Sequence, residues 1–84
     1  MEIKTILQLT YNIRECIKKI TSLDEDIATL NHKITFNNNY FWFVDNNNHE
    51  LYGKINQKEN QISLQKEQIK QLIRQLNEQV HTNH

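Results

Sequence analysis

A seven-residue apolar repeat runs through the first 34 residues and constrains the fold more than any other feature of the chain. Between residues 6 and 34, apolar side chains follow one another in alternating steps of three and four residues. This spacing is typical of a coiled-coil seam, the stripe along which two helices pack. It predicts a helix over residues 3–34, about 48 Å long at 1.5 Å per residue. The seam residues are Ile6, Leu9, Ile13, Cys16, Ile20, Leu23, Ile27, Leu30 and Ile34.

A second helix is predicted over residues 54–80, which are rich in Gln, Lys, Glu and Ile and contain neither Gly nor Pro. Every seventh residue from position 55 is apolar, and two more apolar residues extend the predicted seam near the end of the segment. These residues are Ile55, Ile62, Ile69, Leu76, Ile73 and Val80. A coiled-coil seam has two positions in every seven residues, and Ile55, Ile62, Ile69 and Leu76 occupy the first. The second is occupied by Glu59 and Lys66 before Ile73 and Val80, so the predicted seam is polar near its start.

The two predicted helices match each other when they are folded back as an antiparallel pair. Facing residues then have position numbers with a constant sum, and six apolar pairs share the sum 89. These pairs are Ile34–Ile55, Ile27–Ile62, Ile20–Ile69, Cys16–Ile73, Ile13–Leu76 and Leu9–Val80. Only Leu23 and Leu30 would face charged side chains. We therefore expect an all-α helical hairpin within one chain; the competing arrangement is a parallel homodimer of the first helix, which Ile and Leu at alternating seam positions also favour.

The segment between the helices, residues 35–53, holds a run of aromatic residues. Residues 40–44 have high strand propensity, residues 45–48 suit a turn, and residues 49–52 could return as a second strand. Gly53 would mark the entry to the second helix. We expect a short β-hairpin at the tip of the helical hairpin, or a packed aromatic loop, because a two-stranded hairpin alone is only marginally stable.

The aromatic tip is the segment best suited to bind another protein, because Trp and Tyr dominate binding hot spots. The predicted partner-binding residues are Tyr40, Phe41, Trp42, Phe43 and Tyr52. The alternative is that these rings form the core of the chain's own oligomer. Further apolar residues lie off the predicted seam, at Ile3, Leu7, Ile17, Leu64 and Leu72. A two-helix hairpin has no third layer to bury them, so we expect at least a dimer.

Catalytic and metal-binding patterns are weak in this sequence. Cys16 occupies a seam position, where a buried thiol is expected rather than a nucleophile. His81 and His84 lack a third ligand, and the three carboxylates at positions 24–26 fan out around a helical turn. We expect neither an enzyme nor a bound cofactor or metal.

A stripe of five basic residues on the second helix offers a different function, binding along a phosphate backbone. The residues are Lys54, Lys58, Lys66, Lys70 and Arg74. Because the ten basic and ten acidic residues of the whole chain balance, a solvated helix surface is the simpler interpretation and nucleic acid is not the expected partner.

The location is expected to be the cytoplasm of a bacterium or of an infected host cell. The chain has a single Cys, no apolar run long enough to span a membrane, and no basic stretch followed by an apolar one near its start. Its many Asn, Ile and Lys residues are consistent with an AT-rich phage, viral or bacterial genome.

The predicted order of elements resembles a shortened β-type prefoldin subunit. The resemblance rests on the 6–34 heptads, the strands at 40–44 and 49–52, and the helix at 54–80. It implies assembly through the hairpins and arms that hold non-native proteins. Our main interpretation is a non-enzymatic, oligomeric coiled-coil module, a small regulator or inhibitor of a larger protein. The alternatives are a prefoldin-like chaperone and a nucleic-acid-binding protein.

Overall fold

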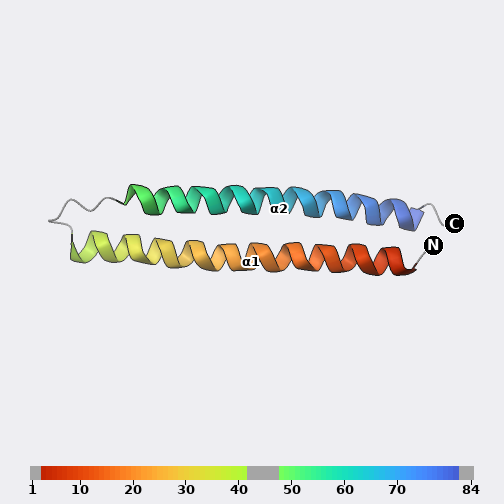
Figure 1. Cartoon of the computed structure of the whole chain (residues 1–84), viewed down its shortest axis with the longest axis horizontal. Helices are drawn as coiled ribbons and strands as arrows, with labels where there is room; N and C mark the ends of the chain where they lie inside the picture. Colours follow the sequence, from red (N-terminus) through yellow and green to blue (C-terminus); the bar gives the residue numbers. More distant parts are fainter. Residues whose placement is uncertain (1–2, 42–47, 82–84) are drawn as a thin grey trace.

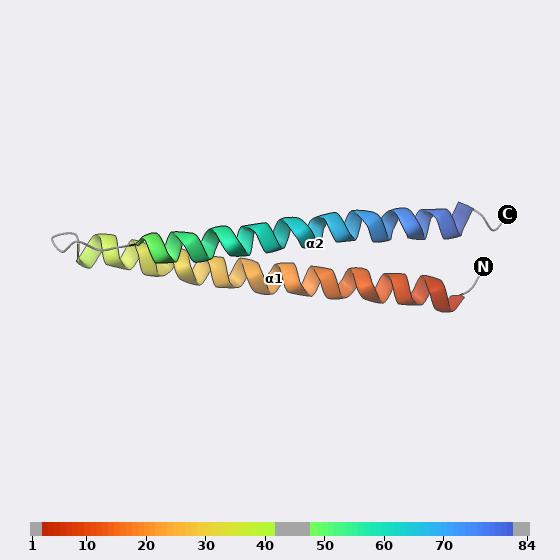
Figure 2. The ribbon, with the colours of Figure 1, turned by 45° about the horizontal axis from the view of Figure 1, so that its top comes forward.

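The computed structural model describes residues 3–41 and 48–81, and shows two long helices packed side by side (Figure 1). Helix α1 spans Ile3–Tyr40 and helix α2 spans His49–His81. The helices run antiparallel, so the start of α1 and the end of α2 lie at the same end of the molecule, opposite the tip (Figures 1 and 2). The result is a rod with Cα extents of 68 × 14 × 13 Å. The predicted all-α hairpin is therefore confirmed.

The seam of α1 lies where the heptad repeat predicts it. All nine apolar residues of the repeat are buried or half-buried, and Leu9, Cys16, Leu30 and Ile34 are the most enclosed. Two clusters form the core. One gathers around Leu9, Cys16 and Leu72 near the chain ends, and the other around Leu30, Ile34 and Ile55 near the tip. No side chain in the described part of the chain is less than 2% exposed, so the core is thin.

The second seam position of α2 lies one residue earlier than predicted. Leu72 is buried at 8% exposure, whereas Ile73 and Val80 are each 45% exposed. The residues that actually occupy this position are Leu51, Lys58, Gln65, Leu72 and Gln79, each buried or half-buried. The observed seam contains one charged side chain, Lys58. The predicted seam would have contained two, Glu59 and Lys66, and burying a charge is costly.

The register between the helices also differs from the predicted sum of 89. Hydrogen bonds between the two arms of the hairpin join Asn37 and Asn38 of α1 to Asn48, the residue just before α2, and join Asp26 of α1 to Lys58 of α2. The position numbers of these pairs add up to 84–86. One helix is thus shifted by about one turn relative to the prediction. The shift lets each first seam position of one helix face a second seam position of the other, and it brings Leu30 into the core cluster with Ile55.

The tip departs furthest from the prediction. Helix α1 continues to Tyr40, six residues past the predicted end, and α2 begins at His49, so residues 49–52 are helical rather than a strand. Leu51 packs against the core cluster near the tip, and this burial outweighs the local strand propensity. Gly53 lies within α2 and does not mark its start. The predicted β-hairpin, on which the prefoldin resemblance partly rested, is therefore not formed by Tyr40 and residues 49–52, which are helical; its residues 42–47 lie outside the described residues.

Neither helix is long and apolar enough, over its described residues, to cross a membrane.

Candidate interaction surfaces

Three aromatic side chains meet at the tip end of α1 and remain largely exposed. The ring centroids of Phe36 and Tyr40 are 4.7 Å apart, and those of Phe36 and Phe41 are 5.9 Å apart. Phe36 is 48% exposed, Tyr40 65% and Phe41 42%. The spacing of four residues places Phe36 and Tyr40 on the same face of the helix. We call Phe36, Tyr40 and Phe41 the tip cluster.

Asparagine side chains hold this end of α1 against α2. Asn48 immediately precedes α2; its Oδ1 accepts a hydrogen bond from Asn37 Nδ2 at 3.2 Å, and its Nδ2 donates to Asn38 Oδ1 at 3.1 Å. The Asn48 backbone carbonyl accepts from the Tyr52 N–H at 2.9 Å, which starts α2. The same residue therefore begins one helix and fastens it to the end of the other, which fixes the position of the tip cluster.

The structure brings together only part of the predicted aromatic site. Tyr40 and Phe41 belong to the tip cluster, whereas Tyr52, 51% exposed, stands on the other helix. Trp42 and Phe43 lie outside the described residues. Phe36 was missing from the predicted site, because the helix was expected to end at residue 34. Its four-residue spacing from Tyr40 is the signal that would have found it.

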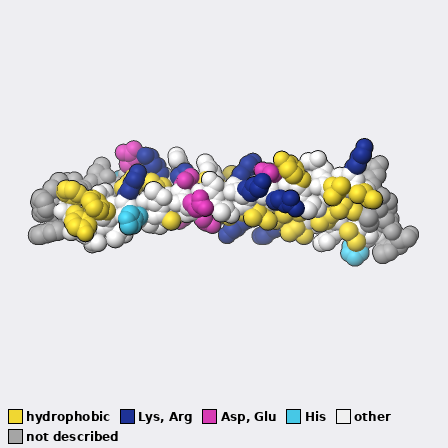
Figure 3. All heavy atoms as spheres, turned by 90° about the horizontal axis from the view of Figure 1, so that it is seen from below, with side chains coloured by type: hydrophobic (Ala, Val, Ile, Leu, Met, Phe, Trp, Pro, Cys, Tyr) yellow, Lys and Arg dark blue, Asp and Glu magenta, His cyan; other side chains and the backbone are white. Residues whose placement is uncertain are grey.

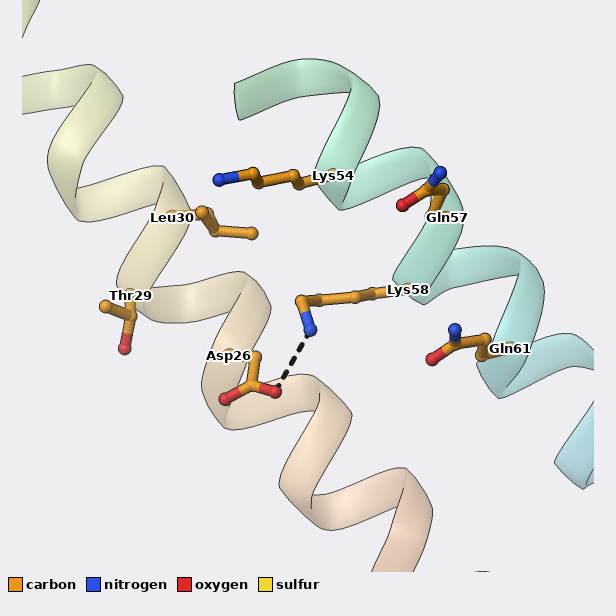
Figure 4. A pocket seen from close by; sticks show the side chains of 7 residues that line it. All are labelled: Asp26, Thr29, Leu30, Lys54, Gln57, Lys58 and Gln61. Atoms are coloured by element: carbon orange, nitrogen blue, oxygen red, sulfur yellow. Dashed lines mark hydrogen bonds and ion pairs between the residues drawn. The ribbon is translucent and has the colours of Figure 1, made fainter. Parts of the chain in front are cut away.

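One long edge of the rod carries a polar groove between the helices. Its larger hollow, about 520 Å³, is lined by residues of both helices: Asp26, Thr29, Leu30, Lys54, Gln57, Lys58 and Gln61. A second hollow of about 270 Å³ continues it past Gln61 toward Leu23 and Gln65. Figure 4 shows Lys58 crossing from α2 beside Leu30 to reach Asp26, with Nζ 3.2 Å from Oδ2. We call this side the groove edge.

The five predicted nucleic-acid-binding residues do not form one surface. Lys54 lines the groove, Lys58 occupies the seam, and the steps of four residues carry Lys66, Lys70 and Arg74 progressively around α2. Three of the five also contact carboxylates. Lys54 lies 3.6 Å from Glu50, Lys58 pairs with Asp26, and Lys70 lies 3.8 Å from Glu67.

The opposite long edge of the rod is apolar near the chain ends. Positions 19 and 26 of α1 and 54 and 61 of α2 line the groove edge, and each precedes a first seam position by one residue. Residues that follow a second seam position by one therefore lie on the other edge. They include Ile3, Ile17, Ile73 and Val80, and Leu7 lies one turn from Ile3. We call these five residues the apolar edge.

The exposed fractions show that the apolar edge is open to solvent. Ile3 is 72% exposed, Leu7 62%, Ile17 51%, and Ile73 and Val80 45% each. In Figure 3, hydrophobic side chains gather at the tip and in the half of the rod toward the chain ends. The rod thus presents two apolar surfaces, one aromatic at the tip and one aliphatic near the chain ends.

Reactive side chains are not gathered into a site in the described part of the chain. Cys16 is a free thiol, 3% exposed and enclosed by the core cluster with Leu9 and Leu72. Among residues 3–41 and 48–81, no group of three His, Cys, Asp or Glu side chains is placed to hold a metal ion. Asp24, Glu25 and Asp26 occupy three successive helical positions, so their carboxylates point in different directions.

Comparison with protein-family models, curated proteins and solved structures found no match to this chain.

Proposed function

We propose that this chain is a non-enzymatic protein-interaction module that binds a larger protein through the tip cluster and thereby acts as a small regulator or inhibitor. The observation that carries the proposal is the placement of Phe36, Tyr40 and Phe41. The Phe36 ring pairs with each of the other two rings, and all three stay 42–65% exposed at the end of a hairpin that its own hydrogen bonds hold in place.

Aromatic rings in this position favour recognition of a protein. A Phe or Tyr side chain offers 150–250 Å² for burial, so the tip cluster leaves on the order of 300 Å² open. Such rings have few rotatable bonds, and their contact with one another already restricts them, which lowers the entropy that binding would cost. A pocket or groove on a larger protein is the complementary shape for a narrow rod that ends in such a cluster.

The rest of the rod supports a binding role more than a chemical one. In the polar groove edge, the central cation Lys58 is paired with Asp26. The only thiol lies inside the core. We further propose that the module is oligomeric, because the apolar edge adds a second aliphatic surface that a single hairpin leaves uncovered.

The proposal is tested by capture of a partner from cells that make this protein. A photo-crosslinking side chain is placed at Asn39, next to Tyr40, and captured proteins are compared between the native chain and a Phe36→Ala/Tyr40→Ala variant. Leu64→Ala is the matched control, because Leu64 is an exposed apolar residue of α2 outside the tip cluster. Circular dichroism confirms that each variant keeps its helices.

We expect one saturable crosslinked product that the Leu64→Ala variant keeps and the double variant loses. If the well-folded double variant keeps the product, the tip cluster is not the binding surface. Suppressed aggregation of many unrelated unfolded proteins, with no single product, would favour the chaperone alternative. Retention on nucleic acid that disappears between roughly 50 and 200 mM salt would favour the nucleic-acid alternative.

A further inference from the structure

We propose that the apolar edge is covered by the same edge of a second copy of this chain, so that two hairpins form an antiparallel four-helix bundle over the halves that hold the chain ends. The two tips then point away from each other. This inference deepens the self-association included in the proposed function and does not depend on what the tip cluster binds.

The spacing of the residues favours a second copy as the occupant. Ile3, Thr10 and Ile17 are each seven residues apart on the same line of α1, and Ile3 and Ile17 lie about 21 Å apart along the helix axis. A two-fold axis at the level of Thr10, perpendicular to the rod, brings Ile3 of one copy level with Ile17 of the other, and the reverse. The small Thr10 side chain at the centre leaves room for the helices to approach each other.

The charge pattern selects the antiparallel arrangement. Toward the tip, the same edge continues as Asp24 on α1 and as Lys66 and Glu59 on α2, all exposed. If the tips of two copies pointed the same way, these charged side chains would be buried in the interface, which is unfavourable. When only the halves with the chain ends overlap, the interface contains the aliphatic residues and the charges remain in water.

The area is sufficient for a dimer of modest affinity. With the exposed fractions given above, the five side chains of the apolar edge leave on the order of 450 Å² open in each copy, as much as the largest apolar patch of a typical monomer. Two copies together would bury roughly 900 Å² from these side chains alone, and neighbouring polar residues would raise the total above the roughly 1,000 Å² that a specific interface needs.

Sedimentation equilibrium of the full chain tests the interface. We expect the native chain to dimerise at micromolar concentration and the Ile17→Glu/Ile73→Glu variant to dissociate at least 100-fold more readily. Both residues are exposed in the single hairpin, so its helical content should stay unchanged. Leu64→Glu is the matched control, because Leu64 is 69% exposed but lies on α2 away from the apolar edge. A dimer that survives the double substitution but not Leu64→Glu would overturn the assigned interface.

The orientation is tested by distances between spin labels in a Cys16→Ala background, with one label per chain. A label at Tyr11, on the outer face of α1 near the chain ends, should give a short distance of roughly 20–40 Å between copies, as expected for helices packed in one bundle. A label at Asn39 should give none in that range, because the tips are at opposite ends. A short distance at Asn39, or a strictly monomeric native chain, would overturn the proposal, and partner capture by the tip cluster would remain a separate question.

Discussion

Leu72 and Ile73 are adjacent in α2, yet replacing each with Ala should have very different effects on stability. Leu72 is 8% exposed and belongs to the core cluster with Leu9 and Cys16, whereas Ile73 is 45% exposed on the apolar edge. The pair therefore reports directly on which residue lies in the seam. The predicted register with sum 89 requires the opposite ranking.

The expected magnitudes follow from burial. Each substitution removes about three carbon atoms, worth about 0.8 kcal/mol each when fully buried. For Leu72→Ala this gives about 2 kcal/mol, and a small cavity raises the loss to about 2–3 kcal/mol, near the low end of the usual range because the core is thin. Ile73 is already 45% exposed in the hairpin, so Ile73→Ala loses only about half of this transfer free energy. The better helix propensity of Ala offsets about 0.4 kcal/mol, so we expect a loss of about 0.5–1 kcal/mol.

Urea unfolding followed by circular dichroism measures this difference. Both substitutions are made in an Ile17→Glu background, so that loss of the proposed self-association does not contribute. A difference of about 2 kcal/mol corresponds to about a thirty-fold change in the unfolding equilibrium, and to roughly 8–16 °C in Tm for a domain of this size. An Ile73→Ala loss equal to or larger than that of Leu72→Ala would refute the seam and register described here.

Three further substitutions test individual features, each by urea unfolding. Gln65→Leu should stabilise the hairpin by about 1 kcal/mol, because Gln65 Oε1 is buried without a hydrogen-bond partner among the described residues; a loss of stability would contradict this. Gly53→Ala should gain about 0.5–1 kcal/mol, since Gly53 is helical and an added Cβ meets nothing within 4 Å. Asn48→Ala should lose about 1–2 kcal/mol with its two hydrogen bonds to α1, and no loss would mean that they do not fasten the tip.

The fold could be predicted from the sequence because α1 carries an uninterrupted heptad repeat. In α2 only the first seam position is regularly apolar, and two neighbouring lines compete for the second position. One contains Ile73 and Val80, the other Leu51 and Leu72. Counting apolar residues favours the wrong line, because within the predicted helix 54–80 the first line offers two and the second only Leu72. The structure selects the line whose polar members include one charge, Lys58, whose stem lies beside Leu30 while its ammonium group reaches Asp26.

The tip could not be predicted from local propensity. The tip ends of the two helices, residues 35–40 and 49–52, include Asn and aromatic residues, and Gly53 follows the second segment. Such residues favour turns or strands in isolation, yet both segments are helical here. The stabilising contacts are tertiary: Leu51 packs near Ile34, and Asn48 bonds to Asn37. Such contacts exist only once the two helices are aligned, so a sequence window around the tip does not contain them.

The candidate surfaces were predictable in kind but not in extent. Aromatic residues at the tip and aliphatic residues off the seam were visible in the sequence. Their grouping depends on the register. Only after Leu72 enters the seam do Ile73 and Val80 join Ile3 and Ile17 on one edge. Likewise Phe36 joins Tyr40 only because α1 continues past residue 34.

The distance between the two chain ends within one molecule tests the central claim most directly, namely that each chain closes on itself as an antiparallel hairpin. Spin labels are placed at Lys4 and Asn77 in a Cys16→Ala background, and the labelled chain is diluted tenfold with unlabelled chain to isolate distances within one molecule. Because packed helix axes lie 8–10 Å apart, we predict a single distance of roughly 15–30 Å. Parallel pairing of α1 between chains would leave α2 extended beyond it, and a distance above about 50 Å, close to the full length of α1, would contradict the account.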